Sequence, residues 1–159
     1  MDVANILRSE SVCCESTARS KKHALEILSH LLAEASLSES SETVLEGLIQ
    51  RERLGCTGLG RAVAMPHTRL PGLEDSVGAF LRLDEPVQFD SSDDEPVDLI
   101  FGLLVPEHCD EARLREVREL IEKLGDRELQ QLLREAKDAT QLYNLLTESL
   151  TIIHKILRP

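Results

Sequence analysis

One stretch decides how the rest of the chain is interpreted: Arg51-Glu-Arg-Leu-Gly-Cys-Thr-Gly-Leu-Gly-Arg-Ala-Val-Ala-Met-Pro-His-Thr-Arg69. Its glycines allow tight turns, in which successive backbone N–H groups can form a concave anion-binding nest. After the glycines, Pro66 fixes its own φ and restricts Met65 to an extended conformation. We therefore expect the chain to reach His67 at the end of a short strand, with the imidazole held in a defined direction.

The charge of this stretch differs from that of the whole chain. The chain holds 18 Lys and Arg against 29 Asp and Glu, a formal net charge of −11. The stretch instead has four arginines and one acid, Glu52. Guanidinium groups match phosphate oxygens, and histidine can take a phosphoryl group covalently. The stretch thus indicates a phosphoryl site, although its glycine pattern alone also fits a connector that carries a surface histidine.

The residues before this stretch predict two helices. Apolar residues recur at helical spacing over Ser20–Ala33, which indicates an amphipathic helix. Serine hydroxyls in Leu37–Ser41 can cap a second helix over Glu42–Leu54, which ends at Gly55. Arg51 then lies in the last turn of that helix, beside the glycines.

Strand-like patterns surround the central stretch. We expect short strands over Ser11–Glu15 and Val63–Met65, a longer one over Ser76–Leu83, and a short extended segment over Val87–Phe89. The nearly continuous apolar run Val97–Val105 is typical of a central strand that is covered on both faces.

The C-terminal part is predicted to be helical. Asp126 provides an N-cap, and Asp138 with Gln141 resembles a capping box. Helices are expected over Asp110–Leu124, over Arg127–Ala136, from Asp138 through Leu146, and in the apolar segment Leu150–Leu157. With 159 residues, these elements predict one α/β domain: a mixed sheet of four or five strands flanked by helices.

Composition excludes several classes of function. The acidic balance argues against nucleic-acid binding, and an aromatic content of 3% argues against a sugar-stacking platform. The N-terminus lacks the layout of a signal peptide, and the apolar run Leu99–Val105 is too short to span a bilayer. We therefore expect a cytoplasmic protein without membrane insertion. No cysteine spacing indicates a metal, and the acidic run Ser91–Pro96 is interpreted as a solvated loop.

The stretch also carries a family resemblance. Arg51-Glu-Arg-Leu-Gly-Cys-Thr-Gly-Leu-Gly60 followed by Ala64-Met-Pro-His67 resembles the active-site signature of the phosphotransferase-system enzyme IIA family of fructose/mannitol type, with its nitrogen-regulatory branch as the best match. That family has Arg-Glu-(Lys/Arg)-x-Gly-Ser-Thr-Gly-x-Gly and then (Ile/Met)-Pro-His. The resemblance covers about residues 11–146 of a single domain over 1–159, and leaves 147–159 as a helical extension.

The resemblance implies a histidine phosphotransferase component. It implies that His67 accepts a phosphoryl group from an HPr-like phosphocarrier protein, with no metal and no cofactor. It assigns the phosphoryl oxygens to Arg51 and to the backbone around Thr57 and Gly58. It further implies a regulatory role, in which the phosphorylation state selects the target proteins that the domain binds; a homodimer stays open.

One position departs from the family pattern. The family's second histidine falls on Arg113, which can contact phosphoryl oxygens but cannot act as a neutral imidazole. His108, in the preceding loop, is the other candidate, and we rank it after Arg113. The departure affects onward transfer more than acceptance of the phosphoryl group. Two alternatives therefore remain: a sugar-specific IIA transport component that passes phosphate to a IIB subunit, and an interaction module that is not phosphorylated.

Overall fold

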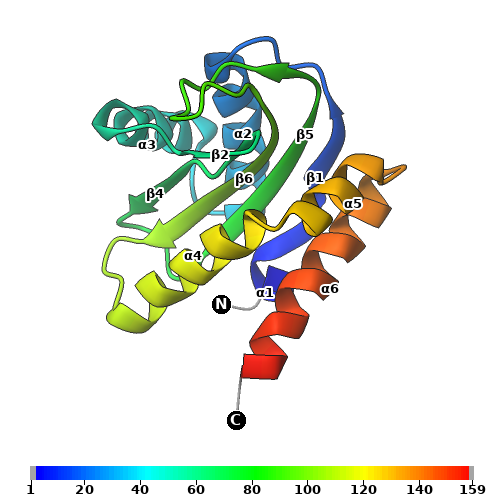
Figure 1. Cartoon of the computed structure of the whole chain (residues 1–159). Helices are drawn as coiled ribbons and strands as arrows, with labels where there is room; N and C mark the ends of the chain where they lie inside the picture. The colour runs from blue at the N-terminus through cyan, green and yellow to red at the C-terminus, as the bar shows by residue number, and fades with distance from the viewer. Residues whose placement is uncertain (1–2, 158–159) are drawn as a thin grey trace.

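A mixed β-sheet runs through the middle of the molecule and carries helices on both faces (Figure 1). The computed structural model describes residues 3–157, with side chains for residues 3–150. The helices are α1 (Val3–Ile6), α2 (Lys21–Ser36), α3 (Ser41–Leu54), α4 (Glu111–Leu124), α5 (Arg127–Glu135) and α6 (Ala139–Leu157). The strands are β1 (Leu7–Ser16), β2 (Gly58–Gly60), β3 (Val63–Ala64), β4 (His67–Leu70), β5 (Val77–Val87) and β6 (Val97–Pro106). The predicted α/β class is confirmed.

The strands follow the order β1-β5-β6-β3-β2, and β4 also pairs with β6. The pairs β1/β5, β3/β6 and β4/β6 are parallel, whereas β5/β6 and β2/β3 are antiparallel. The sheet thus has six strands within the described residues, where four or five were expected. The difference arises because the stretch before and after Pro66 contributes three short strands instead of one.

Strand β6 is the centre of the core, as its apolar run predicted. Its side chains alternate between the two faces of the sheet. Phe101 and Leu103 pack with α4, α5 and α6, while Ile100 and Leu104 pack with α2 and α3. A Cβ at Gly102 would lie 2.6 Å from the side chain of Leu28, so the missing side chain lets α2 pack directly on β6.

The predicted cap signals are confirmed: the hydroxyl of Ser40 accepts a hydrogen bond from the first turn of α3, and Asp126 does the same for α5. Ser20, which was expected as the first residue of a helix, is the N-cap of α2 instead. At the start of α6, Asp138 accepts the Gln141 N–H at 2.8 Å. The side chain of Gln141 returns to the N–H of Lys137 at 2.6 Å, one residue earlier than in a standard capping box.

Some boundaries differ from the predictions. Strand β1 begins four residues earlier than expected, at Leu7, because it pairs with β5 over its whole length. The separate segment over Val87–Phe89 was wrong, since β5 continues to Val87 and pairs there with β6. The two predicted C-terminal helices form one helix, α6, as far as Leu157, and residues 158–159 lie outside the described part.

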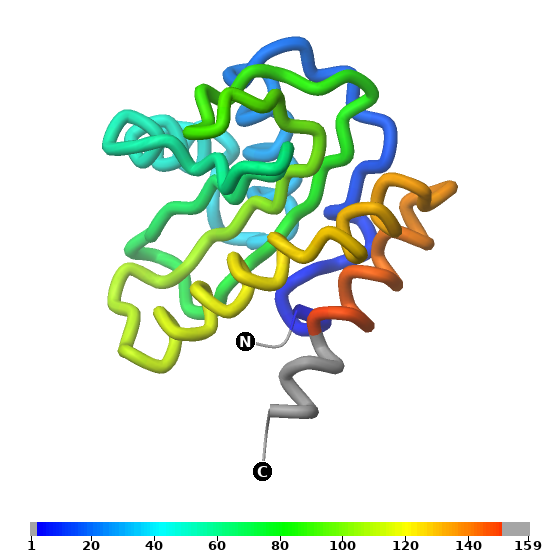
Figure 2. Tube along the Cα trace, viewed as in Figure 1, coloured from blue at the N-terminus to red at the C-terminus, as the bar shows by residue number. Residues whose placement is uncertain are grey.

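The first and last helices of the described chain pack against each other. Helix α1 lies beside α6 (Figure 2), so that the first and last elements pack together at one face of the sheet. None of the helices in residues 3–157 is both long enough and apolar enough to cross a membrane.

Candidate functional site

The turn between β2 and β3 brings the chain to the central strand. It is made by Arg61 and Ala62, which have φ angles of 56° and 68°, together with Gly60 at 84°. Besides the glycine, two residues with side chains thus occupy left-handed conformations, which such residues rarely adopt. A carboxylate stabilises this turn, since Asp93 accepts a hydrogen bond from the N–H of Arg61 at 2.8 Å. That hydrogen bond is also the main cause of a lowered pKa at Asp93.

After this turn, the chain runs beside β6 and hydrogen-bonds to it as far as His67. The N–H of Leu99 donates to the carbonyl of Ala62 at 3.3 Å, and the N–H of Leu103 donates to that of Pro66 at 3.0 Å. His67 is the first residue of β4, in register with Leu103. Since β6 is buried and rigid, its backbone fixes the position of the histidine.

His67 lies in a hollow of about 590 Å³. The end of α3, strands β4 and β6, and the first turns of α4 form its walls. Arg51 and Arg69 supply positive charge, and Leu114 and Val117 supply an apolar wall. Cationic groups beside a partly buried imidazole can bind an anion that is attached to that imidazole.

The ring of His67 has a defined tautomer. Its Nδ1 lies 2.9 Å from the carbonyl oxygen of Met65. A carbonyl oxygen can only accept a hydrogen bond, so Nδ1 carries the proton and Nε2 keeps a free lone pair. Burial lowers the pKa of His67 below its usual value of 6.5; the Met65 carbonyl opposes this shift, and the charge of Arg51 adds to it. The neutral, nucleophilic ring is therefore favoured.

Glu52 holds the loop that supports this geometry. Its carboxylate, 7% exposed, pairs with Lys21 of α2 at 2.7 Å. It also accepts the backbone N–H of Thr57 at 3.2 Å and the hydroxyl of the same threonine. The carbonyl of Thr57 then accepts the N–H of Met65 at 3.0 Å, and the carbonyl of Met65 accepts from His67. Sequence reasoning missed this residue, which appeared only as the one acid of a basic stretch.

The predicted phosphate-binding residues are only partly brought together. Arg51 lines the hollow with His67, and its Nη1 donates to the carbonyl of Gly55 at 2.9 Å. The N–H of Thr57 is paired with Glu52, and the N–H of Gly58 contacts Sγ of Cys56 at 3.2 Å. Both N–H groups thus have partners within the chain, in place of an open nest.

The two candidates for the missing second histidine are not among the residues that line the hollow. Arg113 lies in the first turn of α4, next to Leu114, which does line it. One guanidinium nitrogen of Arg113 is buried and has no hydrogen-bond partner among the described residues. His108 is an exposed residue of the loop before α4. Among residues 3–150, whose side chains the structure describes, no group of three His, Cys, Asp or Glu side chains could hold a metal ion.

The role of Glu52 can be tested with Glu52→Gln. The change removes the negative charge that faces Lys21 and presents an amide to the donors of Thr57, so the free energy of unfolding should fall by about 1–3 kcal/mol. Because the charge of Glu52 raises the pKa of His67, that pKa should fall further. Chemical denaturation and an NMR titration of His67 measure the two effects.

Glu46→Gln on the same helix is the matched control, since Glu46 is exposed. It should change the free energy of unfolding by no more than roughly 0.5 kcal/mol. Equal stability of the two variants would contradict the assigned role of Glu52.

The chain is similar to known proteins over most of its length. A family model described as "Phosphoenolpyruvate-dependent sugar phosphotransferase system, EIIA 2" matches residues 5–149. The nitrogen regulatory protein of Klebsiella oxytoca is 38% identical over 152 residues, which cover 94% of this chain and 92% of the relative. That of Pseudomonas aeruginosa is 40% identical over 129 residues, 81% and 84% of the two chains. A crystal structure of nitrogen regulatory protein IIA-Ntr from Neisseria meningitidis has a TM-score of 0.85 and 38% identity, and covers 91% of this chain and 99% of that chain. The chain therefore belongs to the EIIA 2 family of the phosphotransferase system, and the relatives named here are nitrogen regulatory proteins of that family.

Proposed function

We propose that this domain accepts a phosphoryl group on Nε2 of His67 from an HPr-like phosphocarrier and signals through the target proteins that it binds in each state. The observation that carries the proposal is the contact between Nδ1 and the carbonyl of Met65, which leaves Nε2 as the free nucleophile in a hollow with Arg51 and Arg69. The similarity to nitrogen regulatory proteins supports regulation over sugar transport.

The chemical step needs little machinery beyond this geometry. The lone pair on Nε2 attacks the phosphorus of the carrier's phosphohistidine, and a new N–P bond forms as the carrier's N–P bond breaks. His67 keeps its proton on Nδ1 and the carrier's ring keeps its own N–H, so no proton changes hands. The carrier leaves with a neutral imidazole. The carbonyl of Met65 stabilises the positive charge that the ring of His67 gains.

The arginines would stabilise the transferred group. Arg51 and Arg69 lie in the hollow and offer planar donors to phosphoryl oxygens. We assign a supporting contact to Arg113, whose buried, unpartnered nitrogen would gain an acceptor if it reaches an oxygen. Thr57 and Gly58 could reach the phosphoryl group only by giving up their present hydrogen bonds, so we assign them chiefly to holding the loop.

The proposal is tested first by replacing the nucleophile. His67→Ala should abolish labelling of the purified domain by a phosphorylated HPr-like carrier, because no other ring occupies the hollow among the described residues. His108→Ala is the matched control and should be labelled like the native protein. Labelling of the His67→Ala variant at an undiminished level would overturn the assignment, and circular dichroism checks that both variants are folded.

The lowered pKa of His67 gives a pH prediction. In an NMR titration of the native domain, the His67 ring should titrate below the usual value of about 6.5. The unfolded chain then binds the proton more readily than the folded one. The stabilisation from the neutral ring is therefore complete above about pH 6.5 and declines as the pH falls through the folded pKa. The difference in unfolding free energy between the native and His67→Ala proteins should follow this decline; a midpoint above 6.5 would contradict it.

The role of Arg51 is tested against a neighbour on the same helical turn. Arg51→Lys keeps the charge but loses the planar fork, and should slow phosphorylation by about 10- to 100-fold. Arg53→Lys is the control, because Arg53 is exposed and does not line the hollow. Single-turnover labelling of both variants measures the effect. Equal phosphorylation rates for the two variants would contradict a phosphate-binding role of Arg51 and leave it only the structural hydrogen bond to Gly55.

A further inference from the structure

The turn that leads to His67 is held by residues outside it. All three of its residues, 60–62, have positive φ angles. Residues with side chains rarely adopt such angles, so a turn of this kind persists only where its surroundings hold it. Asp93 accepts the N–H of Arg61 at 2.8 Å, and the carbonyl of Ala62 accepts two N–H groups of β6 at 3.1 and 3.3 Å.

An arginine of α5 reaches the same turn. Nη2 of Arg134 donates to the carbonyl of Arg61 at 3.5 Å. The same guanidinium makes two hydrogen bonds to the carboxylate of Asp98, from Nε at 2.9 Å and from Nη2 at 3.0 Å. Two such contacts fix the orientation of a guanidinium as well as its distance. Because the N–H of Asp98 donates to the carbonyl of Ala62, the pair holds the turn both directly and through β6.

Helix α5, which carries Arg134, is itself fixed at this place. Arg82 of β5 donates through Nη1 to the carbonyl of Leu133 at 2.9 Å and to two further carbonyls at the end of α5. A cation at that end pairs with carbonyls that have no partner within the helix. In the other direction, Nη1 of Arg61 donates to the carbonyl of Gly125, between α4 and α5, at 3.3 Å. The turn and α5 are thus joined by hydrogen bonds from both sides.

The turn determines where the residues after it lie. Strand β3 follows directly and has only two residues paired with β6, so its own pairing holds it weakly. Met65 comes next, and its carbonyl oxygen lies 2.9 Å from Nδ1 of His67. A turn that relaxes would move this carbonyl and weaken the hydrogen bond that keeps the proton on Nδ1 and leaves Nε2 free.

We propose that Arg134, paired with Asp98, is a positioning residue for phosphoryl transfer: it holds the turn so that the carbonyl of Met65 selects the reactive tautomer of His67. The inference rests on the proposed function of His67. Arg134 does not line the hollow around the ring, and it acts only through the backbone. Its side chain is 36% exposed, so its loss affects the site more than the stability of the fold.

The first test measures the tautomer without a phosphoryl donor. With ¹⁵N-labelled histidine and a pH above the pKa of His67, NMR of the native ring should show the proton on Nδ1. Arg134→Gln should lower the ratio of this tautomer to the Nε2–H form by about two- to tenfold, as expected when one hydrogen bond is weakened. Asp98→Asn should lower the ratio too. The double variant should lower it no further than Arg134→Gln alone, because the two residues act as one pair.

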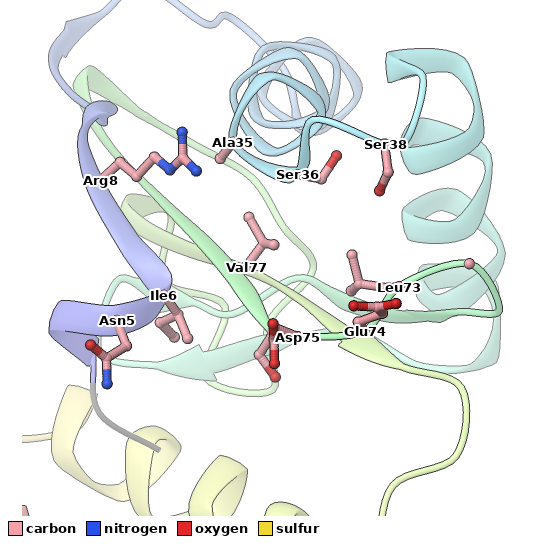
Figure 3. A pocket seen from close by; sticks show the side chains of 12 residues that line it. Asn5, Ile6, Arg8, Ala35, Ser36, Ser38, Leu73, Glu74, Asp75 and Val77 are labelled. Atoms are coloured by element: carbon pink, nitrogen blue, oxygen red, sulfur yellow. The ribbon is translucent and has the colours of Figure 1, made fainter.

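An arginine elsewhere on the surface provides the matched control. Arg8 is an exposed residue of β1 and lines a separate hollow of about 420 Å³ (Figure 3). That hollow shares no residue with the one around His67, so Arg8→Gln should leave the tautomer ratio unchanged. Arg134→Lys keeps the charge but loses the planar fork, and its ratio should fall between those of the native protein and Arg134→Gln. This milder variant decides the question if Arg134→Gln does not fold. An unchanged ratio in the Arg134 variants, or an equal change in Arg8→Gln, would overturn the proposal.

Phosphorylation provides the second readout. Single-turnover labelling by a phosphorylated HPr-like carrier should slow in Arg134→Gln by the factor by which the fraction of the Nδ1–H tautomer falls, because only that form presents a free Nε2. A native labelling rate in spite of a lowered fraction would refute the positioning role. If the carrier labels not even the native domain, the proposed function fails, while the tautomer ratio still decides whether Arg134 positions the ring.

Discussion

The backbone of β6 must have its hydrogen bonds satisfied, because the strand is buried on both faces. On one edge it is paired with β5 along most of its length. On the other edge, two very short strands, β3 and β4, take up its donors and acceptors on either side of Pro66. The position of His67 is therefore set by a requirement of the core: the chain around Pro66 has to follow β6, and the histidine lies where β4 begins.

Glu52 holds the loop that precedes β2 in place, through its hydrogen bonds to Thr57. The donors to its carboxylate come from outside α3: Lys21 lies in α2, and the N–H and hydroxyl of Thr57 lie in the loop. Burying a carboxylate this far from water costs free energy unless such partners surround it. The ion pair thus ties the packing of α2 against α3 to the shape of the turn that precedes His67.

Much of this could be predicted from the sequence because it depends on local chemistry. Ser40 and Asp126 act as caps through hydrogen bonds within three residues of themselves, and the apolar run of β6 has no other plausible place than the core. The place of His67, just after a short strand and Pro66, was also predictable, since both features lie within the same few residues. The tautomer of its ring was not, because it depends on which carbonyl lies beside Nδ1.

The features that the sequence did not predict depend on residues that are distant in the chain. Strands of two to four residues such as β3 and β4 have too few residues for a periodicity, and only their pairing with β6 makes them strands. Arg61 and Ala62 adopt left-handed conformations although both carry side chains, and Asp93, thirty-two positions after Arg61, accepts a hydrogen bond from the backbone there. Glu52 is in the same class, because its partner Lys21 lies in another helix.

The two arginines beside His67 also determine what a binding partner could detect. On the proposed function, the phosphoryl group on His67 carries a charge of about −1.5 to −2 at neutral pH. That charge would nearly cancel Arg51 and Arg69, which line the same hollow. Phosphorylation would thus change the local surface potential far more than the shape of a domain whose β4 is held by the core. A partner that contacts this face within the screening length, about 8 Å at physiological ionic strength, would distinguish the two states by charge, and added salt would blur that distinction before it disturbed the fold.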